Sequence, residues 1–294
     1  MDKSFLKLHI SILLAGFTGI FGKLISLQAG PLVWHRMLLT SLLFLGYLWI
    51  AGKIPRIPWR EAAKIACLGM LLAMHWICFY GSIKYANVSV GVVCFALNGF
   101  FAAIFEPLAN RKSISSREIC FSLISVCGIA LMFHFDTHYR TGIILGVFSA
   151  ALAALHVVGI RRFGGNRPAT PLFLYQMVGG FFLLSLLVPF YVAMFPETVF
   201  MPTAHDIIYL LLLASACTIG LFLLQIQALQ KISAFTVSLS YNLEPIYSIA
   251  LAMILFNEAR ELGMPFAIGL LCIVVSVSLQ SLYAWRQIRR LPSP

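Results

Sequence analysis

Charged residues are scarce in this chain of 294 residues. Asp, Glu, Lys and Arg together make up 11% of it, whereas hydrophobic residues make up 61%. Soluble proteins average about 25% charged and roughly 45–50% apolar residues, so this chain has too little charge to cover a water-exposed surface. The composition therefore excludes a soluble protein and indicates an integral membrane protein.

Several chemical signatures are also missing. The sequence has no G-x-x-x-x-G-K-[ST] motif, which excludes ATP hydrolysis by this chain, and no G-x-S-x-G or H-E-x-x-H motif. The seven cysteines form no C-x-x-C pair and fall inside apolar stretches, so we expect them to be buried small hydrophobes. The 21 basic residues punctuate apolar runs instead of gathering on one face, which argues against a nucleic-acid partner. We expect no catalytic residue, metal or cofactor.

Ten apolar runs are long enough to cross the hydrocarbon core, which takes about 20 residues of helix. We expect the first run to be retained as a span, because no small-x-small cleavage site closes it before Lys23. The ten runs are 6–27, 31–51, 62–83, 89–109, 118–135, 142–161, 171–194, 206–229, 235–256 and 264–285.

The basic residues indicate how these spans are oriented. With ten spans both termini share one side of the membrane. If that side is the cytoplasm, all but five of the 21 Lys and Arg lie inside, as the positive-inside rule requires. The short connections favour a bacterial inner (plasma) membrane. The five exceptions are Lys23, Arg36, Lys84, Arg140 and Arg260.

The sequence resembles itself at half its length. A shift of 146 residues lays 79–99 over 225–245 without a gap, and places Asn98 over Glu244. A shift of 140 places Arg36 over Gln176. The halves 1–140 and 141–294 each hold five spans, and an odd number inserts them in opposite orientations. We therefore predict an all-α membrane protein of ten transmembrane helices in a 5+5 inverted repeat, with a site between the halves near the midplane.

The pattern resembles a known family, the EamA branch of the drug/metabolite transporter superfamily. The marks are Gly19 to Lys23 closing the first span, Pro31 to Arg36 opening the second, Glu244-Pro245 in the ninth and Asn257-Glu258 at its outer end. The first-half counterpart of that last glutamate is Lys112, which departs from the pattern. The resemblance implies a small-molecule transporter or exporter that works by alternating access, and leaves its substrate open.

Polar residues inside the bilayer are costly and usually functional or paired. In the ninth span, Tyr241, Glu244 and Ser248 share one helical face, which either lines the site or packs on a neighbouring helix. Glu244 is the candidate for binding substrate or a coupling proton. Pro245 should leave the carbonyl of Tyr241 without its helical bond. In the fourth span Asn98 is the counterpart of Glu244.

Other polar side chains have two readings each. In the third span His75, flanked by Trp76 and Tyr80, either bonds to an adjacent helix or faces a wet cavity, and His156 in the sixth span is a weaker candidate. Arg36 can snorkel outward, bond to a helix end or clamp a substrate carboxylate, and its counterpart Gln176 keeps only the hydrogen bonding.

Two further positions have structural readings. Glu106 lies near Arg111 and Lys112, which favours an ion pair at the membrane interface. Gly142 and Gly146 form a G-x-x-x-G pattern, which predicts close packing between helices.

The leading hypothesis is a secondary transporter, an exporter of small metabolites such as amino acids or related amphipathic compounds. The alternatives are a passive facilitator or channel, a lipid flippase on the same fold, and, less favoured, an intramembrane enzyme. The expected partners are a small-molecule substrate and the lipid bilayer, with the chain acting as a monomer or homodimer.

The orientation generates a direct test. We predict that a reporter active only outside the membrane stays silent when it is fused after Pro294, because the basic asymmetry places both termini in the cytoplasm. The same reporter fused between the first and second spans, after Gln28, should be active and serves as the control. Activity at the C-terminus would overturn the topology and the inverted repeat with it.

Overall fold

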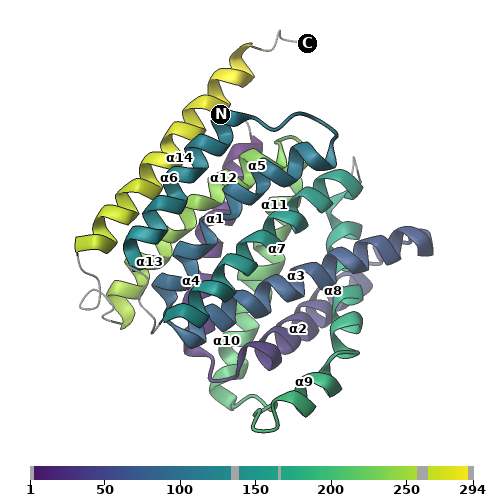
Figure 1. The fold of residues 1–294 in the computed structure, drawn as a ribbon. Coiled ribbons are helices and arrows are strands. Elements are labelled where there is room, and N and C mark those ends of the chain that lie inside the picture. Colours follow the sequence, from purple (N-terminus) through teal and green to yellow (C-terminus); the bar gives the residue numbers. More distant parts are fainter. Residues whose placement is uncertain (1–2, 134–138, 165–166, 257–263, 291–294) are drawn as a thin grey trace.

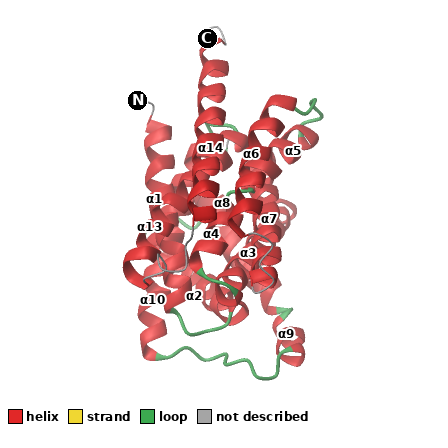
Figure 2. Cartoon of the chain, turned by 60° about the vertical axis from the view of Figure 1, so that its left-hand side comes forward, coloured by secondary structure: helices red, strands yellow, loops and turns green. Residues whose placement is uncertain are grey.

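The computed structural model describes residues 3–133, 139–164, 167–256 and 264–290 of the chain, so Asn257-Glu258 lies outside the described residues. Within these ranges all of the regular secondary structure is helical. The start of helix α1 (Lys3–Leu24) and the end of helix α14 (Met264–Arg290) lie at one end of the molecule, here called the terminal end (Figure 2). Helix α9 (Val188–Met194) lies at the opposite end, here called the far end.

The remaining helices connect these two ends. In the first half they are α2 (Ala29–Ile50), α3 (Trp59–Tyr85), α4 (Val88–Phe95), α5 (Asn98–Ala109) and α6 (Ser116–Phe133). In the second half they are α7 (Arg140–Gly164), α8 (Ala169–Ser185), α10 (Ala204–Ala214), the π-helix η2 (Ser215–Gly220), α11 (Leu221–Leu229), α12 (Ala234–Ser240), the 3₁₀ turn η3 (Tyr241–Leu243) and α13 (Glu244–Phe256).

The described helices make the chain a multi-pass membrane protein. Six of them are long and apolar enough to cross a membrane, counting α4 with α5 and α10 with α11, and the bent pair α8–α9 would be a seventh. By this measure of helix length and hydropathy, the described helices fall short of the ten expected spans. The apolar part of α6 is only Ile119–Leu131, and the turn η3 leaves α13 with 13 residues. Such a helix is about 20 Å long, short of the roughly 30 Å core.

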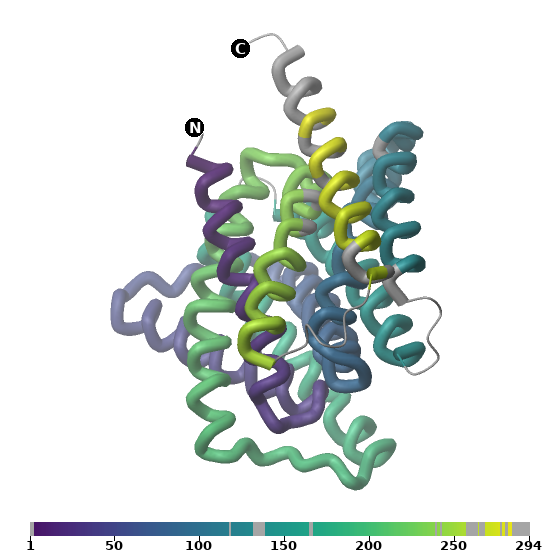
Figure 3. Tube along the Cα trace, turned by 90° about the vertical axis from the view of Figure 1, so that its left-hand side faces the viewer, coloured from purple at the N-terminus to yellow at the C-terminus, as the bar shows by residue number. Residues whose placement is uncertain are grey.

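Long helices pack along one another in a bundle (Figure 1). Helix α3 packs along both α7 and α8, and α1 packs along α11 and α13. Helix α14 lies beside α6 on one side of the bundle (Figure 3). Because residues far apart in sequence fill the space between these helices, both halves of the chain form one apolar core.

The cysteines depart from the expectation that all are buried. Cys94 and Cys217 are buried, but Cys67, Cys120 and Cys127 are exposed. Exposure on the outside of a membrane helix means contact with lipid, which an apolar thiol tolerates as well as a protein core.

Small residues let several helices approach closely. A Cβ on Gly146 would lie 2.5 Å from the Cβ of Cys94, and one on Gly142 would lie 2.6 Å from the Cβ of Ala86. This confirms the packing role predicted for the two glycines. The tightest approach joins α3 to α8, where a Cβ on Gly69 would lie 1.9 Å from the backbone oxygen of Gln176.

We predict that Gly69→Ala lowers the thermal unfolding midpoint of the purified protein in detergent. The added methyl group must displace backbone of α8, and overpacking of this kind costs about 1–3 kcal/mol. Gly46→Ala in α2 is the matched control, because a Cβ there meets nothing within 4 Å. The control should be neutral or slightly stabilising, since Ala favours a helix over Gly. Equal midpoints for the Gly69 variant and wild type would contradict the close contact.

Candidate functional site

Two helical spans are interrupted at the same register of the repeat. In the first half, the amides of Ala96 and Leu97 donate to carbonyls three residues back, at 3.0 and 3.1 Å, and α5 then begins at Asn98. In the second half the turn η3 precedes α13, which begins at Glu244. Asn98 and Glu244 are the two residues that the shift of 146 superimposes. Each interrupted span therefore starts its second segment at a candidate residue.

The starts of these two spans also correspond. The side chain of Asn87 accepts a hydrogen bond from the amide of Val90 at 2.8 Å and caps α4. The hydroxyl of Ser233 accepts one from the amide of Thr236 at 3.0 Å, just before α12. Positions 87 and 233 are again 146 apart. The local structure of both spans thus follows from the same sequence pattern.

The break in the second half corrects one expectation. The carbonyl of Tyr241 was expected to lack a hydrogen bond because Pro245 cannot donate one. In the structure the amide of Glu244 donates to it instead, within the 3₁₀ turn. Pro245 is the second residue of α13. At this position a backbone N–H has no acceptor within the helix, so the missing N–H of proline costs no helical hydrogen bond.

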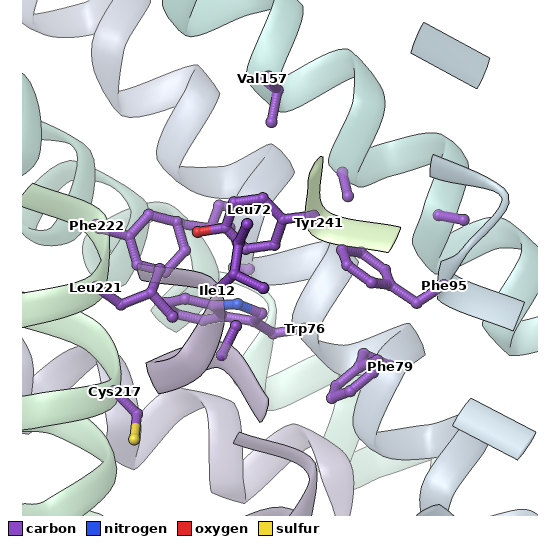
Figure 4. Packing of buried hydrophobic residues seen from close by; sticks show 14 of the residues in the cluster. Ile12, Leu72, Trp76, Phe79, Phe95, Val157, Cys217, Leu221, Phe222 and Tyr241 are labelled. Atoms are coloured by element: carbon purple, nitrogen blue, oxygen red, sulfur yellow. The ribbon is translucent and has the colours of Figure 1, made fainter. Parts of the chain in front are cut away.

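A central cavity of about 60 Å³ lies between the interrupted spans and their neighbours. That volume has room for a few water molecules. Aromatic side chains from several helices form much of its wall, as Figure 4 shows for Trp76, Phe79, Phe95, Phe222 and Tyr241. Polar side chains also line it: Thr18, Arg36, His75, Asn98, His156, Gln225, Tyr241 and Glu244.

Glu244 and Asn98 border the cavity, and their side-chain oxygens make no hydrogen bond within the described residues. The Glu244 side chain is buried, and no hydrogen bond or ion pair from the described residues engages its carboxylate. The carbonyl oxygen of Asn98 is buried and likewise has no hydrogen-bond partner within the described chain. Buried polar groups are nearly always hydrogen-bonded, so these two are placed to bind a ligand that enters the cavity.

Arg36, by contrast, is held on three sides. Its guanidinium donates to the hydroxyl of Thr218 at 2.9 Å, the hydroxyl of Tyr80 at 2.7 Å and the carbonyl of Cys217 at 3.1 Å. It also lies over the ring of Trp76, with 3.7 Å between its carbon and the ring centroid. Only 1% of the side chain is exposed, which excludes snorkelling.

The π-helix η2 makes room for this arginine. Cys217 and Thr218 lie within it, and the Thr218 hydroxyl donates to the carbonyl of Leu213, five residues back, at 2.6 Å. Widened turns of this kind release backbone carbonyls from the regular ladder and often occur at functional sites. The arginine therefore fixes α2, α3 and η2 to one another while its charge faces the cavity.

The two histidines bond to adjacent helices and also line the cavity. Nδ1 of His75 lies 2.9 Å from both the carbonyl and the hydroxyl oxygen of Ser149 on α7. Nε2 of His156 lies 3.0 Å from the side-chain oxygen of Gln176, the repeat counterpart of Arg36. The two readings proposed for His75 are thus compatible, since one ring nitrogen bonds to α7 while the residue borders the cavity.

The remaining candidates are held by hydrogen bonds to neighbouring helices. The hydroxyl of Tyr241 donates to Ser11 on α1 at 3.1 Å, and Tyr80 lies behind Arg36, outside the cavity lining. The hydroxyl of Ser248 donates to the carbonyl of Gly16 at 2.9 Å, so this residue joins α13 to α1 and does not border the cavity. These contacts position the lining.

Glu106 differs from its expected role. It makes no ion pair with Arg111 or Lys112 in the described chain. Its carboxylate instead accepts hydrogen bonds from the amides of Ala234 and Phe235, at 3.2 and 2.5 Å, at the start of α12. The start of a helix has unpaired backbone amides and a partial positive charge, so it can bind a carboxylate in place of a basic side chain.

Sequence reasoning missed Gln225 and Thr18 in the cavity lining. The shift of 146 superimposes Gln225 on Phe79, and both border the cavity, so the repeat held the signal for it. Thr18 gave no signal, because a single threonine in an apolar helix satisfies itself more often than it lines a site. In the structure its hydroxyl oxygen has no partner in the described chain.

Comparison with known proteins agrees with this architecture. Comparison with the curated proteins gives no match. Among solved structures, 28 chains match. One of them is a crystal structure of a protein that is 17% identical in sequence, with a TM-score of 0.70, and the match covers 98% of this chain and 99% of that chain. At this identity the likeness shows the fold alone.

A family description covers nearly the whole chain in two copies. The model of the EamA-like transporter family matches residues 3–134 and again residues 140–282. Residues 135–139 separate the two matches. The chain therefore belongs to the EamA-like transporter family.

Proposed function

We propose that the protein is a secondary transporter that exports small metabolites, such as amino acids or related amphipathic compounds, by alternating access. One observation carries this proposal. The carboxylate of Glu244 is buried in the helix bundle, borders the central cavity and makes no hydrogen bond or ion pair within the described chain. A charge in that position is stable only when something binds it, which is what a carrier site requires.

Symmetric contacts between the halves support ten spans in a 5+5 inverted repeat. The interrupted pairs α4–α5, α10–α11 and α12–α13 each count as one span, as does α8–α9. Helix α1 then packs on α11 and α13 as α7 packs on α3 and α4, and α6 packs on its counterpart α14. Helix α2 packs on α10 as α8 packs on α3.

Carboxylates close the two ends of the bundle, and each joins one half to the other. At the far end Asp206 accepts hydrogen bonds from the amide and hydroxyl of Ser26, at 2.6 and 2.7 Å. At the terminal end Glu106 accepts from the amides that begin α12. In alternating access these contacts break one at a time, so the cavity opens first to one side and then to the other. In the proposed orientation the terminal end is cytoplasmic, in a bacterial inner membrane.

Within the cavity Glu244 and Arg36 have different tasks. Glu244 binds the ammonium group of a substrate or a coupling proton, because no hydrogen bond or ion pair from the described residues engages its carboxylate. Arg36 keeps its charge in place through Thr218, Tyr80 and Cys217, and two of its five N–H groups remain available for a substrate carboxylate. Since the sequence has no ATP-binding loop, the energy comes from an ion gradient or from exchange.

A ligand screen gives the substrate needed for the tests. Purified protein is heated with amino acids, nucleobases and cationic drugs, and a specific ligand at 100 times its Kd adds about 2.7 kcal/mol of apparent stability. The best ligand is then used in proteoliposomes that carry a proton gradient.

We predict that Glu244→Gln abolishes accumulation against a gradient while the protein still inserts and stays monodisperse. The amide keeps the shape and hydrogen bonding of the side chain but cannot carry the charge or release a proton. Exchange of an uncharged substrate should survive. Glu61→Gln is the control, because Glu61 is partly exposed and its described ion pair is with Arg167 at the surface. Wild-type accumulation with the same pH dependence would show that Glu244 is structural.

We predict that Arg36→Lys loses at least about nine-tenths of transport and also lowers the unfolding temperature. A lysine ammonium cannot reach Thr218, Tyr80 and Cys217 together, nor stack on Trp76, because it lacks the planar fork. Arg167→Lys, at the surface, is the control and should change neither quantity. Full transport by the Arg36 variant would leave only a generic charge role for this residue.

A further inference from the structure

The far end of the molecule carries two further cavities, on the outside of the bundle. Helices α8 and α9 meet at a bend of 46°, and none of the residues of α9 is buried. Phe190 is 72% exposed and Met194 73% exposed. A short apolar helix that leaves the bundle at this level lies among lipids.

An apolar cavity of about 250 Å³, here called the lateral groove, lies between α9 and the helices beside it. Its wall comes from α2, α3, α8, α9 and the segment after α9, and is almost entirely apolar. The residues are Gly30, Trp34, Met74, Ile77, Leu184, Leu187, Val188, Phe190, Tyr191, Met194, Phe195 and Phe200.

A more polar cavity of about 450 Å³, here called the head pocket, continues from the groove. Tyr191, Met194 and Phe195 line both cavities, so the two are adjoining parts of one site. Charged groups of both signs border the head pocket: Lys84 at the end of α3 and Glu197 after α9. The site is therefore amphipathic, with an apolar part and a part that carries both charges.

The two charges are available to a ligand. The Lys84 ammonium donates one hydrogen bond to the carbonyl of Ile25, and an ammonium has three donors. Glu197 is exposed, and no ion pair from the described residues engages it. A lysine with a tyrosine, Tyr85, beside it at the end of a membrane helix is also typical of the level of lipid headgroups.

We propose that this site binds one phospholipid with a primary-amine headgroup, of the phosphatidylethanolamine type. One of its two acyl chains fills the lateral groove, its phosphate binds the Lys84 ammonium and its own ammonium binds the Glu197 carboxylate. Charge complementarity selects this class, because a headgroup with phosphate but no amine leaves Glu197 without a partner. The proposal does not depend on the proposed transport function, since none of these residues lines the central cavity.

The test measures lipid retention by native mass spectrometry, with the purified full-length protein in detergent. Phosphatidylethanolamine and phosphatidylglycerol with identical acyl chains are titrated separately. Wild type should retain one phosphatidylethanolamine per chain and bind it about tenfold more tightly than phosphatidylglycerol, as expected for one additional charge-assisted hydrogen bond.

Three variants separate the parts of the site. Glu197→Gln should weaken phosphatidylethanolamine binding about tenfold and leave phosphatidylglycerol unchanged, whereas Lys84→Met should weaken both. Phe190→Glu should abolish retention of both lipids, because it places a charge in the groove. Lys53→Met, in the exposed segment after α2, is the control and should match wild type.

Other outcomes overturn the proposal. Equal affinity of wild type for the two lipids, or no effect of Glu197→Gln on phosphatidylethanolamine, would remove the headgroup recognition. Occupation of the groove by the detergent alkyl chain, with no displacement by either lipid, would make it a nonspecific apolar surface. In a different outcome, Glu197→Gln changes the thermal shift that the transport substrate causes and leaves lipid retention unchanged. That result would assign the head pocket to the transport path.

Discussion

The buried guanidinium of Arg36 is the arrangement on which the centre of this molecule depends. A full charge inside a membrane protein is tolerated only when its donors are satisfied and its position is fixed. Here two segments distant in sequence supply the partners: Tyr80 and Trp76 from α3, and Cys217 and Thr218 from the π-helix. The packing of α2 against α3 and α10–α11 follows from meeting that requirement.

The need to place polar groups inside the bundle also explains why two spans are interrupted. A regular helix satisfies all of its backbone groups internally and presents few polar groups to a ligand. A 3₁₀ turn in the middle of a span ends one segment and begins another, and the residue at the new start can project from the interruption. Asn98 and Glu244 occupy those starts, and both border the central cavity. A polar side chain is thus presented to the central cavity from within each of the two spans.

The sequence was sufficient to predict the helical class, the family, and the correspondence of Asn98 with Glu244, because a repeat offset is read directly from spacing. It also placed Arg36, His75, Trp76 and His156 at what proves to be one cavity. Partners within the bundle could not be predicted. The π-helix around Cys217, the amides that hold Glu106 and the contact of Ser248 with α1 depend on which helices become neighbours, and composition does not encode this. The ten predicted crossings are not all recovered as long helices for a related reason, since breaks within apolar runs are set by tertiary contacts.

The contact between Gly69 and the backbone of Gln176 has a mechanical consequence. Two helices whose backbones touch cannot slide along each other, because any side-chain ridge would have to climb over its neighbour. Rotation about the point of contact meets no such barrier. Helices α3 and α8 belong to opposite halves of the chain, so this point is a fulcrum: small rotations there become larger, opposite displacements at the two ends of the bundle. In the proposed alternating-access cycle, a lever of this geometry would open one end of the bundle as it closes the other.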